Sequence, residues 1–231
     1  MSDRCVGRSF PRRALPVFLW AWFALTLPVV TVLTLNEYSR FTLLQTCAHW
    51  RGKWLGSDSV FIGDSLTAGG RNWGWRLGRG PFSSRNLAAS GCTVRQVQAQ
   101  AREALKYKPA RVFVMVGTND LLEERDEAAV LRDCETLLHI LSASWRPPRI
   151  VVTLVPQTAY EKYSEKVRVF NRRLRELCQS QAVEVVDLNP QIAPQGVLLP
   201  QYSLDGVHLS AAAYQVWTKA LRGVIARAPA K

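Results

Sequence analysis

Histidine and cysteine are scarce in this chain of 231 residues, which contains three histidines and five cysteines. The cysteines are widely spaced without a C-x-x-C pair, and their number is odd. The sequence therefore favours neither a zinc cluster nor a disulfide framework. Cys134 and Cys178 fall on the apolar faces of predicted helices, where we expect them to be buried.

Acidic residues are also in the minority, because 18 Asp and Glu stand against 30 Lys and Arg, which leaves a net charge of +12. The basic residues are scattered, and the sequence has no zinc-finger, basic-zipper or RNA-recognition motif. We therefore predict no nucleic-acid partner. The expectation is a basic surface that is either simply solvated or turned towards an anionic membrane.

Charge is missing altogether from residues 14–35, which read ALPVFLWAWFALTLPVVTVLTL. As a helix this stretch would be about 33 Å long, enough to cross a hydrocarbon core of roughly 30 Å. A cleaved signal peptide is the alternative, but its apolar part is usually only about 7–15 residues long and ends at a small-residue cleavage site. The sequence predicts one transmembrane helix at 14–35, after a basic segment at 1–13 and before a juxtamembrane stalk at 36–55.

The charges on either side of this stretch predict its orientation. Four arginines lie within residues 1–13, whereas Asn36 and Glu37 follow the apolar run. The positive-inside bias then keeps the N-terminus in the cytoplasm and carries the rest of the chain across the membrane. We expect a single-pass protein of the inner (cytoplasmic) membrane, with its domain at residues 56–231 in the periplasm of a Gram-negative cell.

Short apolar runs alternate with helical patterns throughout that domain. The runs predict five strands, at residues 59–62, 86–89, 111–116, 150–155 and 183–188. Apolar residues at helical spacing predict helices across residues 94–105, 130–141, 167–177 and 214–225. This alternation is typical of an α/β fold whose parallel sheet is covered on both faces and binds ligands at the carboxyl ends of its strands.

Residues that could perform nucleophilic chemistry lie at those strand ends. The motif GDSL at residues 63–66 follows the first strand and contains Ser65. A serine hydroxyl is a weak nucleophile unless a base takes its proton. His208 is the histidine best placed to do so, because Asp205 lies three residues earlier and one tight turn can orient both side chains.

Donors for a developing oxyanion are available at neighbouring strand ends. The backbone N–H groups of Ser65 and Gly91 and the side-chain amide of Asn119, in the motif GTND, are the candidates. Asp64 is expected to be a structural hydrogen-bonding residue rather than a member of a triad.

These blocks, in this order, resemble the SGNH hydrolases, also called GDSL esterases and lipases, over about residues 58–226. The resemblance places Ser65, Gly91, Asn119 and His208 at the signature positions and Asp205 as the third triad member. It implies a three-layer α/β/α sandwich of flavodoxin-like type with strand order 2-1-3-4-5. It also implies ester hydrolysis through an acyl-serine intermediate, with no metal and no cofactor.

The substrate is less sharply indicated. Trp73, Trp75 and Arg76 are candidate substrate-binding residues, because tryptophan stacks on sugars or lines acyl grooves and arginine binds phosphate or carboxylate. A helix whose aromatic side is buried is the alternative. We expect a membrane-anchored serine esterase acting on O-acetyl groups of envelope carbohydrate, or on lysophospholipid or short acyl esters. An O-acyltransferase on envelope polysaccharide and a non-catalytic envelope binding module are the competing interpretations.

Overall fold

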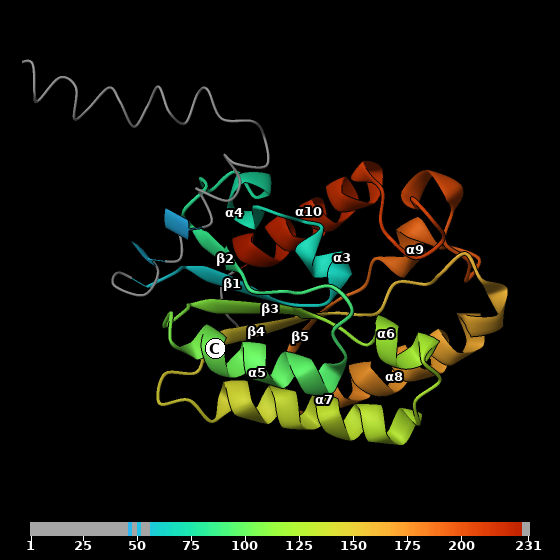
Figure 1. The fold of residues 1–231 in the computed structure, drawn as a ribbon, viewed down its shortest axis with the longest axis horizontal. Helices are drawn as coiled ribbons and strands as arrows, with labels where there is room; N and C mark the ends of the chain where they lie inside the picture. The colour runs from blue at the N-terminus through green and yellow to red at the C-terminus, as the bar shows by residue number, and fades with distance from the viewer. Residues whose placement is uncertain (1–45, 48–49, 52–55, 228–231) are drawn as a thin grey trace, which may run out of the picture. The chain divides into compact units, whose positions relative to one another are not determined.

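The structure, a computed structural model, describes residues 46–47, 50–51 and 56–227 (Figure 1). The predicted basic N-terminus and transmembrane helix lie outside the described residues, as does most of the predicted stalk. Within the described ranges, none of the helices has the length and apolar character needed to cross a bilayer.

A five-stranded parallel sheet with the order β2-β1-β3-β4-β5 forms the centre of the fold, as the resemblance implied. Val60 pairs with Val112, which in turn pairs with Ile150, so the three inner strands run in register. The strands are β1 (Ser59–Gly63), β2 (Ser84–Asn86), β3 (Arg111–Met115), β4 (Arg149–Thr153) and β5 (Glu184–Val186).

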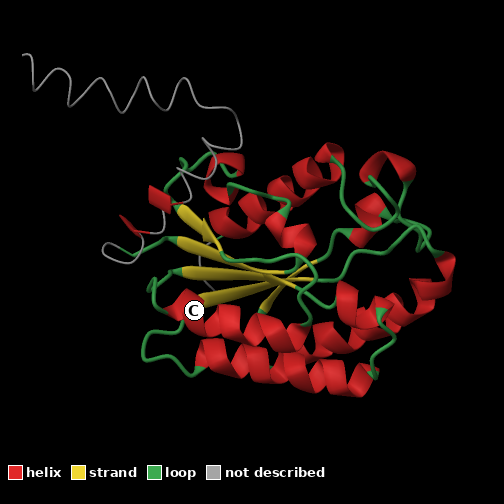
Figure 2. Cartoon of the chain, viewed as in Figure 1, coloured by secondary structure: helices red, strands yellow, loops and turns green. Residues whose placement is uncertain are grey.

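Helices cover both faces of this sheet and complete the three layers (Figures 1 and 2). One face packs against α5 (Val94–Leu105), α7 (Glu127–Ser142) and α8 (Ser164–Ser180). The other face packs against α3 (Ser65–Ala68), α4 (Trp73–Arg76), α9 (Asn189–Ile192) and α10 (Ala211–Ala226). Short helices at α6 (Thr118–Leu122), η1 (Glu161–Tyr163) and η2 (Pro200–Tyr202) lie in the connections.

Alternation along the strands divides the buried side chains into two cores. Val60 and Ile62 of β1 point into the core beneath α5, α7 and α8, whereas Phe61 points to the opposite side. Phe61 stacks on Trp73 with ring centroids 4.7 Å apart, and Trp73 meets Trp217 of α10 edge to face at 4.9 Å. Such aromatic pairs add stability beyond the apolar area that they bury.

The position of Trp73 corrects one sequence prediction. Its side chain is completely buried, and its indole N–H donates to the carbonyl of Thr67 at 3.0 Å. Trp73 is therefore a core residue, and its assignment to substrate binding is wrong. The alternative expectation, a helix with its aromatic side buried, holds at this position.

The second strand also differs from its prediction. It spans residues 84–86 rather than 86–89, because this edge strand is only partly buried and is built from polar residues. Leu87 and Ala89 continue beside β1 through N–H groups that donate to Phe61 and Gly63, at 2.8 and 3.2 Å. The apolar residues at 87–89 thus belong to the connection that follows the strand, and not to the strand itself.

Candidate active site

A turn that only glycine can form, at the end of β1, presents Ser65 as the first residue of α3. Gly63 has φ +151°, and a Cβ atom there would lie 2.0 Å from the carbonyl oxygen of Met115, so this turn requires glycine. Asp64 caps α3 by accepting the N–H of Leu66 at 3.0 Å. The N–H of Ser65 has no acceptor among the described residues and remains available to a ligand.

A contact from the C-terminal part of the chain supports the same short helix. The hydroxyl of Tyr214, on α10, donates to the carbonyl of Leu66 at 2.7 Å and is buried there. Asn86 holds the end of α3 and the segment after it through its side-chain amide, which donates to the carbonyls of Thr67 and Arg71 at 3.2 and 3.1 Å.

Three predicted residues meet at the carboxyl edge of the sheet in the order that general-base chemistry needs. The Nε2 of His208 lies 3.0 Å from Ser65 Oγ, and its Nδ1 lies 2.6 Å from Asp205 Oδ2. The structure therefore places the nucleophile, base and orienting carboxylate within hydrogen-bond distance, although 143 residues separate Ser65 from His208.

The turn that carries Asp205 and His208 holds the carboxylate in its charged form. Asp205 Oδ1 accepts the backbone N–H groups of His208 and Val207 at 2.7 and 3.0 Å. These bonds and the His208 side chain lower the pKa of Asp205 from 3.8 to about 2, with the His208 N–H as the largest cause. The carboxylate can then hold the imidazole in one tautomer at neutral pH.

The other predicted oxyanion donors follow β2 and β3, the two strands that flank β1 in the sheet. Gly91 has φ +74°, a backbone conformation that favours glycine, and its N–H has no acceptor in the described part of the chain. Asn119 lies in the first turn of α6, where its Nδ2 donates to the carbonyl of Cys92 at 3.0 Å. An amide nitrogen carries two protons, so this contact leaves one for a substrate oxygen.

Asp64 is structural, as expected, but its environment is unusual. The side chain is completely buried, and Oδ2 has no hydrogen-bond partner among the described residues. Burial is the main reason that the pKa of Asp64 rises from 3.8 to about 7; the Leu66 N–H opposes the shift, and the Asp120 carboxylate adds to it.

This raised pKa predicts a pH-dependent stability that Asp64→Asn removes. Between about pH 4 and pH 7 the unfolded chain loses the Asp64 proton while the folded chain keeps it, so stability falls as pH rises through this window. A rise of the pKa from 3.8 to about 7 makes this loss on the order of a few kcal/mol. Urea unfolding at pH 4 and pH 8 should show that the free energy of unfolding falls more between these two pH values in the wild type than in Asp64→Asn. If the free energy of unfolding changed equally with pH in the two proteins, the raised pKa of Asp64 would be wrong.

The two remaining substrate candidates lie in α4. Trp75 is 65% exposed and is free to contact a ligand. Arg76 is half-buried, with its guanidinium 4.8 Å from the ring centre of Tyr214 and its Nε donating to the Gly70 carbonyl at 2.7 Å. Arg76 is thus largely engaged within the protein, and a contact of either residue with substrate stays a prediction.

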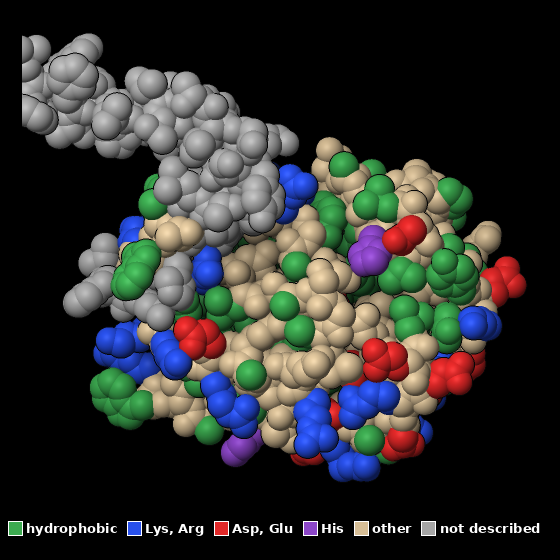
Figure 3. Space-filling model, viewed as in Figure 1, with side chains coloured by type: hydrophobic (Ala, Val, Ile, Leu, Met, Phe, Trp, Pro, Cys, Tyr) green, Lys and Arg blue, Asp and Glu red, His purple; other side chains and the backbone are tan. Residues whose placement is uncertain are grey.

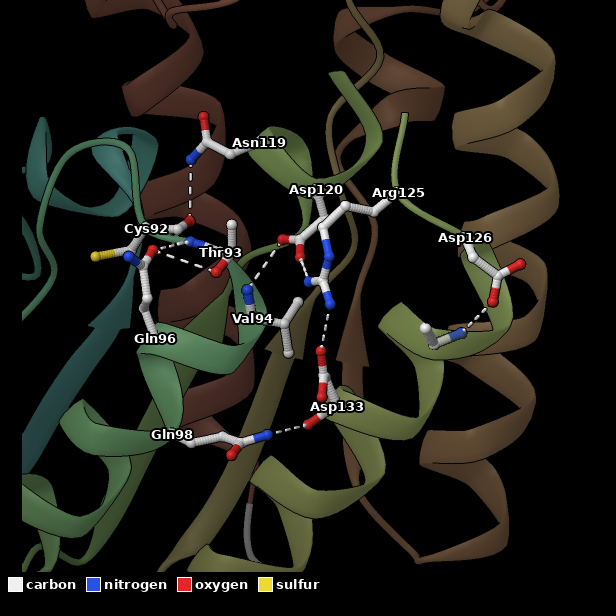
Figure 4. A network of polar contacts seen from close by, with 11 residues as sticks. Cys92, Thr93, Val94, Gln96, Gln98, Asn119, Asp120, Arg125, Asp126 and Asp133 are labelled. Atoms are coloured by element: carbon white, nitrogen blue, oxygen red, sulfur yellow. Dashed lines mark hydrogen bonds and ion pairs between the residues drawn. The ribbon is translucent and has the colours of Figure 1, made fainter. Parts of the chain in front are cut away.

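Sequence reasoning missed two polar residues that support the site. Gln100, on α5, pairs with both backbone groups of Gly63, accepting its N–H at 2.8 Å and donating to its carbonyl at 3.0 Å. Asp120 is completely buried and accepts the N–H of Val94 at 2.9 Å (Figure 4). The GTND motif was a signal for Asp120, whereas nothing in the sequence distinguishes Gln100 from the other polar residues of its helix.

The face of the protein drawn in Figure 3 carries both acidic and basic side chains. Figure 3 shows a histidine beside an acidic side chain on the upper half of this face, and Lys and Arg side chains gathered on the lower half, over α5 and α7. The side chains of His208 and Asp205 are 46% and 55% exposed, so the base is open to solvent and to large substrates.

Known proteins resemble this chain in sequence pattern and in fold. The model of the GDSL-like Lipase/Acylhydrolase family matches residues 61–216. A GDSL-like lipase from Bacteroides thetaiotaomicron superposes with a TM-score of 0.65 at 19% identity, covering 82% of this chain and 97% of that one. A lipase/acylhydrolase from Enterococcus faecalis gives a TM-score of 0.60 at 18% identity, covering 73% and 95%.

A third similar structure is a variant of an acetyl xylan esterase from Geobacillus stearothermophilus. Its TM-score is 0.58 at 20% identity, and the alignment covers 76% of this chain and 98% of that one. No curated protein matches the sequence. At these identities the structural neighbours show a shared fold.

Proposed function

Since the chain belongs to the GDSL-like lipase/acylhydrolase family and is an ester hydrolase, we propose that it cleaves esters through an acyl intermediate on Ser65. The observation that carries this proposal is the continuous series of contacts from Asp205 through His208 to Ser65. Each contact lies within hydrogen-bond distance, as a nucleophile with its base and orienting group requires.

In the first half-reaction, Ser65 Oγ attacks the ester carbonyl while His208 Nε2 takes its proton. The N–H groups of Ser65 and Gly91 and the amide of Asn119 stabilise the oxyanion that forms. The bond to the alcohol oxygen then breaks, and His208 returns the proton to the leaving alcohol. In the second half-reaction His208 takes a proton from water, which attacks the acyl carbonyl. The bond between the acyl carbon and Ser65 Oγ then breaks, His208 returns the proton to Oγ, and the acid is released.

The proposed ester is an O-acetyl group on carbohydrate, with lipid or other short acyl esters as the alternative. Support comes from the exposed side chains of His208 and Asp205, which leave the site open to an ester on a large polymer, and from the exposed indole of Trp75, which could stack on a sugar. The similarity to an acetyl xylan esterase points in the same direction.

A chain-length series tests the proposed substrate. We expect the full-length protein to hydrolyse p-nitrophenyl acetate faster than the octanoate or palmitate, and to release acetate from an acetylated polysaccharide. Preference for the long esters would favour the lipid alternative. Transfer of acetyl to an added polysaccharide, in place of release, would favour the acyltransferase.

Removing one oxyanion donor should slow the chemical step. We expect Asn119→Ala to lower kcat by roughly 10²–10³, the usual effect of one such donor. KM for the same ester should change little, because the charge that Asn119 stabilises develops only in the transition state. Steady-state rates over a range of ester concentrations that extends from below KM to saturation give both values. A change confined to KM would make Asn119 a substrate-binding residue instead.

We further propose that residues 14–35 anchor the enzyme in the cytoplasmic membrane with its domain in the periplasm. Support comes from the uncharged run and from the four arginines before it. The protein should stay with membranes after high-salt and carbonate washes, and alkaline phosphatase fused after Lys231 should be active. An inactive fusion would place the domain in the cytoplasm, and a soluble chain beginning near residue 36 would mean a cleaved signal.

A further inference from the structure

The buried carboxylate of Asp120 has a set of partners that the catalytic cycle does not use. Oδ2 accepts the N–H of Val94 at 2.9 Å, and Oδ1 pairs with the guanidinium of Arg125. The other arm of Arg125 lies 2.8 Å from Asp133 on α7 (Figure 4). The carboxylate, on α6, thus joins the first turn of α5 to α7 through a charge-assisted network.

Asn119 and Asp120 are consecutive, and they bind the end of one loop and the residue that follows it. This oxyanion loop, residues 90–93, carries the predicted donor Gly91 and leads directly into α5 at Val94. Asn119 donates to the carbonyl of Cys92, and Asp120 accepts from Val94, so the end of the loop is held at two points. The segment that follows Gly91 is therefore anchored on α6 through Cys92 and Val94.

Accurate placement matters at such a loop. Oxyanion donors stabilise a transition state only if they are already aimed at the developing charge. A misplacement of about 1 Å at a reacting centre can lower the rate about 10²-fold. Gly91 itself is exposed. Apart from its two chain neighbours, no heavy atom of the described residues lies within 4 Å of the place where its Cβ would be, so its surroundings give it little direct support.

We propose that Asp120 and Arg125 are positioning residues that hold the oxyanion loop, and with it the Gly91 N–H, against Asn119 and Ser65. This inference rests on the proposed esterase mechanism. Asp120 and Arg125 do not contact the substrate in this proposal. They raise kcat because they hold Val94, and with it the oxyanion loop, in place.

The substitution Asp120→Asn tests the contact with little change in volume. An asparagine has one oxygen and one NH₂ group, but the site presents two donors, the Val94 N–H and the Arg125 guanidinium. Whichever way the amide turns, its NH₂ group faces one of these donors. The loop or the arginine must then move.

We expect Asp120→Asn to lower kcat for p-nitrophenyl acetate about 10- to 100-fold while KM stays within about twofold. Combined with Asn119→Ala, the loss should be smaller than the product of the two single losses, because both act on one oxyanion hole. Rates are normalised to the folded fraction measured by circular dichroism.

If Asp120→Asn does not fold, the variant Arg125→Lys tests the same network with a smaller change. Arg125→Lys keeps the positive charge beside Asp120 but lacks the fork that reaches Asp133 as well. We expect a several-fold loss of kcat with unchanged KM.

Asp126→Ala is the matched control. Asp126 lies close in the chain and caps α7 by accepting the Ala129 N–H at 2.8 Å, but it makes no hydrogen bond or ion pair with the oxyanion loop within the described structure (Figure 4). Its loss should lower the melting temperature and leave kcat of the folded protein unchanged.

An unchanged kcat in Asp120→Asn and Arg125→Lys, or losses that multiply fully with that of Asn119→Ala, would overturn the positioning role. A loss of kcat in Asp126→Ala as large as that in Asp120→Asn would also overturn it, since general destabilisation would then explain both. Failure of the esterase mechanism is distinct, because Ser65→Ala would then keep its activity whatever the Asp120 variants do.

Discussion

Replacing Ser65 with alanine should abolish turnover, lowering kcat for a chromogenic ester by about five to six orders of magnitude. Without Oγ no acyl-enzyme forms, and only the weaker assistance of the oxyanion donors to direct attack by water remains. The fold should persist, because Ser65 makes its described side-chain hydrogen bond only to His208. Burst-phase kinetics would show the loss directly, as no acyl-enzyme accumulates.

Ser83→Ala is a suitable control, since it removes the same hydroxyl from a serine whose Oγ donates only to the Gly80 carbonyl. This variant should keep wild-type kinetics. Wild-type turnover in folded Ser65→Ala would remove Ser65 from the nucleophile role and would leave the binding-module interpretation in place.

Replacing His208 with alanine should be almost as damaging, because the serine then has no base within reach. We expect a loss of about five orders of magnitude or more, and we expect the double variant Ser65→Ala/His208→Ala to be no worse than either single variant. The comparison of the double variant with the single variants is the decisive measurement. If Ser65 and His208 act as one unit, removing either already removes the whole rate enhancement of the pair.

His139→Ala provides the comparison for this second variant, because His139 is exposed on α7 and belongs to no predicted catalytic group. Its activity should be unchanged. If His208→Ala retained substantial activity, or if the double variant lost the product of the two single effects, Ser65 and His208 would not act together.

Much of this site was predictable because it depends on topology. In a parallel α/β sheet, residues that follow different strands meet at one edge, whatever their separation in the chain. Ser65 and Asn119 follow β1 and β3, which are neighbours in the sheet, and the structure brings them to the same edge as expected. Asp205 and His208 were predictable as a pair because three residues of spacing suit one turn.

The sequence did not predict which side chains of α4 are buried. Trp73 is buried and Trp75 is exposed, although they lie two residues apart in a helix of four residues. A helix of one turn has too few residues to reveal an apolar face by periodicity. Which tryptophan faces the core depends on Phe61 and Trp217, whose contacts the local sequence does not encode.

Ser65 and His208 are 143 residues apart in the sequence, so the contact between them forms only when nearly the whole domain has folded. The nucleophile helix α3 is also supported by Tyr214, beyond His208, so its final packing depends on the last helix of the domain. Contacts of such high sequence separation are entropically expensive to close and tend to form late. During refolding, esterase activity should therefore return after the helical circular dichroism signal has recovered. During synthesis Ser65, the oxyanion loop and Asn119 all precede Asp205 and His208, so a chain that lacks its last segment has the nucleophile but no base to activate it.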